Sequence, residues 1–107
     1  MIENARIEST FLGREDHGVF TFMIHLQGPS WCQSFGGTFL EYKSPERVPT
    51  AAALALIDIV EALGAGSWEG LAGRLCRVES GEPYGPITAI GNVLDDRWVR
   101  MEDYGRE

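Results

Sequence analysis

The stretch from Thr50 to Gly64 constrains the fold more than any other part of the chain. It opens with a residue suited to capping a helix and closes with a glycine, the usual signal for a helix end. Asp58 and Glu61 alone interrupt its apolar positions, which are Leu54, Leu56, Ile57, Ile59, Val60, Ala62 and Leu63. A helix that is apolar around most of its circumference cannot place one face on a sheet and leave the rest in water. We therefore expect one side to pack on a sheet and another side to pack on a second subunit.

Three strands are predicted before this helix. Residues 2–11 and 19–26 alternate between two faces around a turn at residues 15–18, so they should pair as antiparallel neighbours. In the first strand, one face is expected to contain Ala5, Ile7, Ser9 and Phe11. In the second strand, one face is expected to contain Phe20, Phe22, Ile24 and Leu26. A third run, residues 33–42, contains adjacent Gly36 and Gly37, which weaken a strand. They indicate either a bulge or a surface that a ligand approaches closely.

Two further strands are predicted after the helix. A short helical turn at residues 67–69 should anchor Trp68 in the core, and strands at 73–80 and 87–94 flank a loop rich in glycine and proline. Residues 95–98 are expected to form a polar tip, and the tail from Glu102 is expected to fray. The predicted fold class is α+β, with a small antiparallel sheet of about five strands packed on one long α-helix plus the short helical turn. The whole chain, residues 1–107, is expected to be one domain.

The charge balance restricts the possible partners. Nine basic side chains against sixteen acidic ones give a net charge of −7, which argues against duplex DNA and anionic membranes. An anionic ligand would have to be held by local arginines. No apolar run approaches the ~20 residues that span a bilayer, and the alternating N-terminus does not resemble a signal peptide, so a cytoplasmic protein is expected. A core this small also favours association with further copies of the chain.

The residues that carry chemistry do not assemble a known catalytic motif. No metal-ligand spacing connects Cys32 and Cys76 with His17 or His25, and both cysteines are expected to be reduced and packed. The acidic pairs at 15–16 and 95–96 fall in turns, where solvated carboxylates are usual. We therefore predict a protein that is not an enzyme and uses neither a cofactor nor a metal. A hydrolase with Cys32 as nucleophile remains an alternative.

Several residues favour binding of a nucleotide-like anion. Arg47 stands just before the helix entry, where backbone N–H groups attract phosphate, and Arg77 and Arg97 add local positive charge. Aromatic residues fall in or beside loops and the glycine-rich strand, and a purine could stack on them: Trp31, Phe35, Tyr84 and Trp98. The alternative, that each ring belongs to the core and each arginine is a solvated surface residue, remains open.

Five segments, in order along nearly the whole chain, resemble one family. They are residues 2–13, the Glu15-Asp16-His17-Gly18-Val19-Phe20-Thr21-Phe22 hairpin, Gln33-Ser34-Phe35-Gly36-Gly37, Trp68-Glu69-Gly70-Leu71-Ala72-Gly73, and Ile90-Gly91-Asn92-Val93-Leu94-Asp95-Asp96-Arg97-Trp98. The sequence resembles the first type of Thoeris anti-defence protein from bacteriophages. The resemblance implies a sponge that binds cyclic ADP-ribose isomers without degrading them, a sheet with a long helix, and dimers that group into hexamers. Some members of that family also bind cyclic di- or trinucleotides at separate sites. Two loops, 42–49 and 81–86, depart from the family pattern, and so does Ser34, where the pattern has glycine.

These observations predict a phage protein that blocks a bacterial immune effector by sequestering its signal in the cytoplasm of the infected cell. We expect Phe35 and Trp98 to stack on the ligand or wall its pocket, and Arg47 and Arg77 to bind phosphate. Gln33 and Asp96 are expected to orient the base or the ribose. The alternative is a small oligomeric interaction module that inhibits a host defence enzyme directly.

Overall fold

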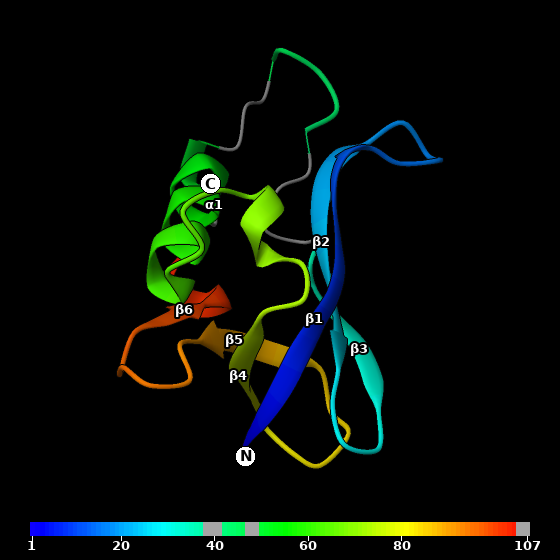
Figure 1. The fold of residues 1–107 in the computed structure, drawn as a ribbon. Helices are drawn as coiled ribbons and strands as arrows, with labels where there is room; N and C mark the ends of the chain where they lie inside the picture. Colours follow the sequence, from blue (N-terminus) through cyan, green and yellow to red (C-terminus); the bar gives the residue numbers. More distant parts are fainter. Residues whose placement is uncertain (38–41, 47–49, 105–107) are drawn as a thin grey trace.

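A computed structural model describes residues 1–37, 42–46 and 50–104 of the chain. These residues form an antiparallel sheet of six strands and one α-helix, so the α+β class is confirmed (Figure 1). The strands are β1 (Ile2–Arg14), β2 (Phe20–Gln27), β3 (Cys32–Gly36), β4 (Leu75–Ser80), β5 (Ile87–Gly91) and β6 (Trp98–Arg100). The helix is α1 (Thr50–Leu63), and two short 3₁₀ turns are η1 (Glu69–Leu71) and η2 (Met101–Asp103).

The sheet has the strand order β3-β2-β1-β4-β5-β6, which includes one strand more than predicted. The additional strand is β6, which pairs with β5 through Ile90 and Val99. The prediction of a polar tip at 95–98 is therefore wrong at its last residue. The backbone N–H of Asn92 bonds to the Arg97 carbonyl at 3.0 Å, which closes the turn and returns the chain beside β5.

A bulge in β1 changes which side chains face the core. Pairing with β2 shifts between Ile7 and Ser9, so Glu8 is an extra residue. Before the bulge Ala5 and Ile7 share the face that points into the core. After it Thr10 lies opposite the buried Ile24, and Phe11 is 39% exposed. The expectation that Ser9 and Phe11 share a face with Ala5 and Ile7 is wrong, because one inserted residue reverses the alternation.

Helix α1 has the predicted limits, and at 14 residues it is of ordinary length. Gly64 follows it with φ +68°, the left-handed conformation that glycine adopts without strain at a helix end. Its inner side lies against β5 and β6, and it buries Ala52, Ala55, Ile59, Ala62 and Leu63. Leu54 and Ile57 on its other side are 58% and 53% exposed.

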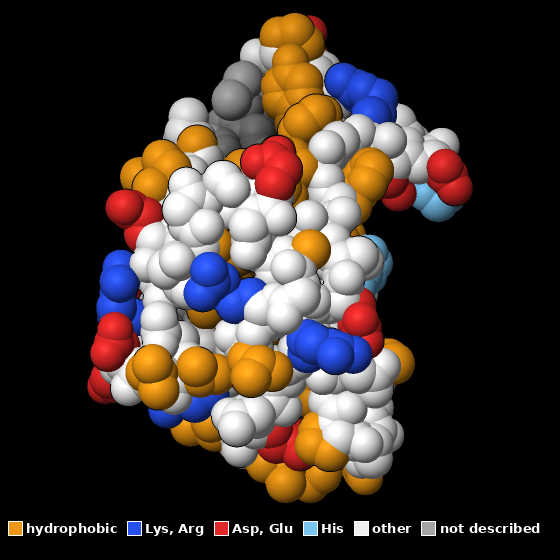
Figure 2. Space-filling view, in the orientation of Figure 1, with side chains coloured by type: hydrophobic (Ala, Val, Ile, Leu, Met, Phe, Trp, Pro, Cys, Tyr) orange, Lys and Arg blue, Asp and Glu red, His pale blue; other side chains and the backbone are white. Residues whose placement is uncertain are grey.

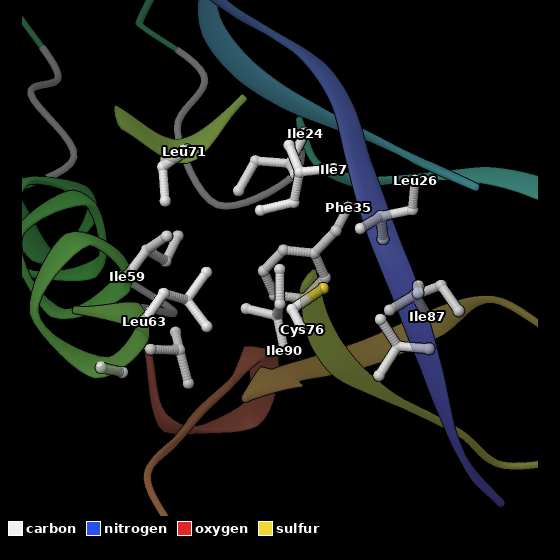
Figure 3. Packing of buried hydrophobic residues seen from close by; sticks show 14 of the residues in the cluster. Ile7, Ile24, Leu26, Phe35, Ile59, Leu63, Leu71, Cys76, Ile87 and Ile90 are labelled. Atoms are coloured by element: carbon white, nitrogen blue, oxygen red, sulfur yellow. The ribbon is translucent and has the colours of Figure 1, made fainter. Parts of the chain in front are cut away.

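The core lies between α1, η1 and the inner face of a strongly coiled sheet, in which β3 also approaches β5. Ile7, Ile24 and Phe35 of the sheet converge there with Ile59 and Leu63 of the helix (Figure 3). Trp68 packs edge to face on Phe22, with ring centroids 5.7 Å apart, which confirms its predicted role as an anchor. Within the described residues, no helix is both long and apolar enough to cross a membrane.

The two cysteines differ in environment. Cys76 is fully buried, as predicted, and burial raises the pKa of its thiol to about 12. Cys32 is exposed, so the expectation that it is packed is wrong. Its Sγ donates to Oε1 of Gln27 at 2.8 Å.

Candidate functional site

The outer face of β4, β5 and β6 brings predicted site residues together. Val78, Ile90 and Val99 point into the core, so their neighbours along each strand point to the opposite face. The register aligns Arg77, Gly91 and Trp98 in one row across the three strands, and Glu79, Ala89 and Arg100 in the next.

Trp98 lies between two arginines. A side-chain carbon on Gly91 would come within 2.6 Å of the indole ring, so the ring rests directly on the backbone of β5 and needs a glycine beneath it. The guanidinium carbons of Arg77 and Arg100 lie 4.9 Å and 5.2 Å from the ring centroid, within the range of cation–π attraction. We call Arg77, Trp98 and Arg100 the arginine–tryptophan cluster.

Hydrogen bonds fix each member of the cluster. Arg77 donates from Nε to the Asn92 carbonyl at 2.7 Å and from Nη2 to the Asp95 carbonyl at 2.9 Å. A guanidinium has five N–H groups, so within the described structure Arg77 keeps others for an anionic ligand. Trp98 donates to Asp96 at 2.9 Å, which shows that Asp96 orients the indole ring. Arg100 pairs with Glu79 at 2.6 Å, and this hydrogen bond raises the pKa of the guanidinium.

The other predicted site residues lie elsewhere. Phe35 is 1% exposed and belongs to the core, so its ring has no free face for a ligand in this structure. Gln33 is on β3 and donates to the Tyr84 carbonyl at 3.2 Å. Arg47 lies outside the described residues. The sequence reasoning did not select Arg100, although its position two residues after Trp98 would have placed it on the same face had a strand been predicted there.

Asn92 stabilises the turn between β5 and β6, to which Arg77 and Trp98 are hydrogen-bonded. Its Oδ1 accepts from the N–H groups of Leu94 and Asp95 at 2.8 Å and 3.1 Å, and its Nδ2 donates to the Ala62 carbonyl near the end of α1 at 2.9 Å.

Asn92→Ala removes all three contacts and should lower the free energy of unfolding by about 1–2 kcal/mol. Urea unfolding measures the loss. Asp95→Ala is the matched control, because that exposed side chain makes no hydrogen bond with the part of the chain that the structure describes. An equal loss in both variants would contradict the assignment.

Apart from this cluster, a hollow of about 610 Å³ lies on the outer face where β1, β2 and β3 meet. It is lined by Phe11, Glu15, His17, Val19, Thr21, Met23, Gly36 and Gly37, which include residues of three of the family-like segments. Gly36 has φ +117°, and a side-chain carbon there would come within 2.8 Å of the Phe22 carbonyl oxygen. Close approach of the β2 backbone therefore accounts for Gly36, and its pairing with Met23 shows no bulge.

Glu15 organises the turn beside this hollow. Its Oε1 accepts from the His17 backbone at 2.7 Å, and its Oε2 lies 3.2 Å from His17 Nδ1. The hydrogen bond from the His17 ring is the main cause of a lowered pKa for Glu15. The turn is therefore stabilised while Glu15 is ionised, and this contribution is lost as the pH falls through the lowered pKa.

His17→Ala should move the pKa of Glu15 upward, toward that of an ordinary glutamate, because the ring hydrogen bond is removed. A carboxyl-detected NMR titration measures this pKa directly. His25→Ala should leave it unchanged, since the His25 ring bonds to Ser34 at 2.9 Å. A Glu15 pKa that is the same in wild type and His17→Ala would contradict the stated cause.

The described residues contain no group of three or more histidines, cysteines or acids placed to hold a metal ion. In the same residues neither histidine ring bonds to Cys32, since His17 bonds to Glu15 and His25 to Ser34. The arrangement therefore offers cations, an aromatic ring and hydrogen-bond donors for a ligand. Comparisons with protein-family models, with curated proteins and with solved structures each found no match.

Proposed function

We propose that this protein is a non-catalytic sponge for cyclic ADP-ribose isomers, which a phage uses to block activation of a bacterial immune effector. The observation that carries the proposal is the arginine–tryptophan cluster, where Arg77 and an aromatic ring are fixed together on a chain of net charge −7, beside Arg100 in its ion pair with Glu79. A pyrophosphate needs local cations of this kind, because the field of the whole molecule repels it. The resemblance to Thoeris anti-defence proteins supports the same ligand class and a cytoplasmic site of action in the infected cell.

In this proposal each cluster residue has a separate role. The remaining N–H groups of Arg77 bind pyrophosphate oxygens, and a guanidinium plane of the cluster stacks on the base. Trp98 keeps both arginines in place. Because its indole N–H is held by Asp96, the ring does not have to be ordered when the ligand arrives.

A second copy of the chain is part of the proposal. Leu54 and Ile57 are more than half exposed. Ile57 also lines an apolar groove of about 410 Å³, together with Leu12, Leu56, Val60, Glu61 and Trp68. Pairing through this side of α1 would bury these residues, and contact between subunits would preorganise a ligand pocket. Dimers, and hexamers built from them, are the assemblies that the resemblance suggests.

The test is to incubate the protein with cyclic ADP-ribose isomers, remove free ligand by gel filtration, denature the protein and analyse what is released. We expect the isomer to be recovered unchanged. Recovery of an altered ligand would refute the sponge mechanism, and failure to retain any isomer would refute the ligand class.

Arg77→Ala should weaken binding of the retained isomer by roughly 10- to 150-fold, the range for losing a charged hydrogen bond. Isothermal titration calorimetry measures the change. Arg6→Ala is the matched control, because Arg6 is exposed on β1 and, among the residues that the structure describes, pairs only with Glu8 at 3.2 Å. Equal affinities in wild type and Arg77→Ala would remove the cluster from the proposal.

The alternative function, a module that inhibits a host defence enzyme directly, is favoured by one observation, the exposed apolar side of α1. That surface would then receive the enzyme. Gel filtration distinguishes the two proposals, since a stable dimer or hexamer favours the sponge and a monomer favours the inhibitor.

A further inference from the structure

The loop between β4 and β5, residues 81–86, holds one residue in a strained conformation. Tyr84 has φ +61°, and among the described residues it is the only one other than glycine with a positive φ. A glycine would adopt this conformation without strain, whereas a side chain makes it unfavourable. Strain of this kind persists only where the surrounding structure enforces it, and it often marks a functional site.

Contacts from outside the loop fix Tyr84 in place. Gln33 on β3 donates to the Tyr84 carbonyl at 3.2 Å. Inside the loop, Gly85 N–H bonds to the Glu82 carbonyl at 3.0 Å, and the Ser80 hydroxyl donates to the same carbonyl at 2.9 Å. The backbone of Tyr84 is therefore anchored by a neighbouring strand as well as by its own loop.

The side chain of Tyr84 is nevertheless 70% exposed. Its hydroxyl lies 3.5 Å from the Ser30 hydroxyl in the β2–β3 loop, so the two loops stand side by side. Beside Ser30, Trp31 is also fixed, because its indole N–H donates to Glu3 at 3.0 Å. This end of the molecule is at the bottom of Figure 1, and Figure 2 shows hydrophobic side chains gathered there.

We propose that Tyr84, with Ser30 and Trp31 beside it, forms a binding site for a planar, uncharged heteroaromatic ring such as a nucleobase. An exposed ring on an anchored backbone presents its face to a flat ligand, and such stacking on an aromatic side chain is favourable. Glu82 belongs to the same loop and the Glu3 carboxylate accepts from the Trp31 indole, so the negative charge near this site disfavours an anion.

This site is separate from the arginine–tryptophan cluster and does not rest on the proposed function. The 81–86 loop joins one end of β4 and β5, while the turn that holds Arg77 and Trp98 follows the other end of β5. The loop also departs from the pattern of the family that the sequence resembles, so the resemblance does not imply this site.

NMR titration with adenosine tests the site without requiring a cyclic ADP-ribose isomer. We expect saturable upfield shifts of the Tyr84 ring resonances, which are assigned by their absence in Tyr84→Gly. Ribose, which lacks the aromatic base, should cause no shift. Adenosine monophosphate should bind more weakly than adenosine, because the nearby carboxylates repel its phosphate. If adenosine shifts no Tyr84 resonance, or ribose shifts it equally, the site is refuted.

Two variants separate the ring from the fold. Tyr84→Gly removes the ring and also relieves the strained φ, so its melting temperature should be equal or higher while adenosine binding weakens at least about fivefold. Tyr84→Phe keeps the stacking surface and should bind within about twofold of wild type. Unchanged adenosine binding in Tyr84→Gly, or equal losses in both variants, would overturn the proposal. Neither result alters retention of cyclic ADP-ribose isomers at the cluster.

Discussion

Replacing Phe22 with alanine should lower the free energy of unfolding by about 3–5 kcal/mol, the usual range for removing a buried phenylalanine. The side chain is fully buried, and its ring meets Trp68 at an interplanar angle of 85°. Phe22 also lies against Gly36, where a side-chain carbon would come within 2.7 Å of the ring. One substitution therefore opens a cavity between β2, β3 and the segment that carries Trp68.

Equilibrium unfolding in urea, followed by circular dichroism, measures this loss. Phe11→Ala is the matched control, because it deletes the same group from a side chain that is 39% exposed on the other face of the sheet. Its loss should stay below about 1.5 kcal/mol, since much of that ring is already in water. Similar losses in the two variants would mean that Phe22 does not anchor the core as described.

The alternation in the second strand was sufficient to group the residues that share each face of β2, and the Thr50 and Gly64 signals were sufficient to bound α1. Both patterns run over many residues, so one exception does not hide them. The bulge at Glu8 and the three-residue strand β6 could not be predicted in this way. A single inserted residue leaves no mark in the composition, and three residues are too few to show a period.

The candidate site was predictable only in part, for a related reason. Arg77 and Trp98 lie together because the β4–β5–β6 register aligns them, and Asp96 joins them through its hydrogen bond with Trp98, whereas Arg100 required a strand that was not predicted. Phe35 was assigned to the ligand because it is an aromatic residue of the glycine-rich strand, and alternation groups the residues of that strand by face without saying which face is inside. That choice is made by pairing, which sets Phe35 opposite the buried Ile24 and leaves Ser34 outside with His25.

Leu54→Glu combined with Ile57→Glu should abolish self-association and leave a monomer that still folds. Both side chains are more than half exposed in the single chain, so the charges are solvated in the monomer. In a dimer formed through this side of α1, the same carboxylates would be buried against apolar groups without partners, which is strongly unfavourable. Neither residue belongs to the buried set of α1, so the core should be unaffected.

Sedimentation equilibrium over a range of protein concentrations measures the association, and thermal unfolding confirms that the variant is folded. Asn4→Glu combined with Ser9→Glu adds the same charge at exposed positions on β1 and should leave the assembly intact. Persistence of the wild-type assembly in the helix variant would show that another surface joins the subunits.

If self-association and retention of a cyclic ADP-ribose isomer are lost together in the helix variant but not in the β1 variant, the pocket depends on subunit contact. If retention survives in the monomer, the arginine–tryptophan cluster binds its ligand within one chain, and preorganisation by a second copy is excluded.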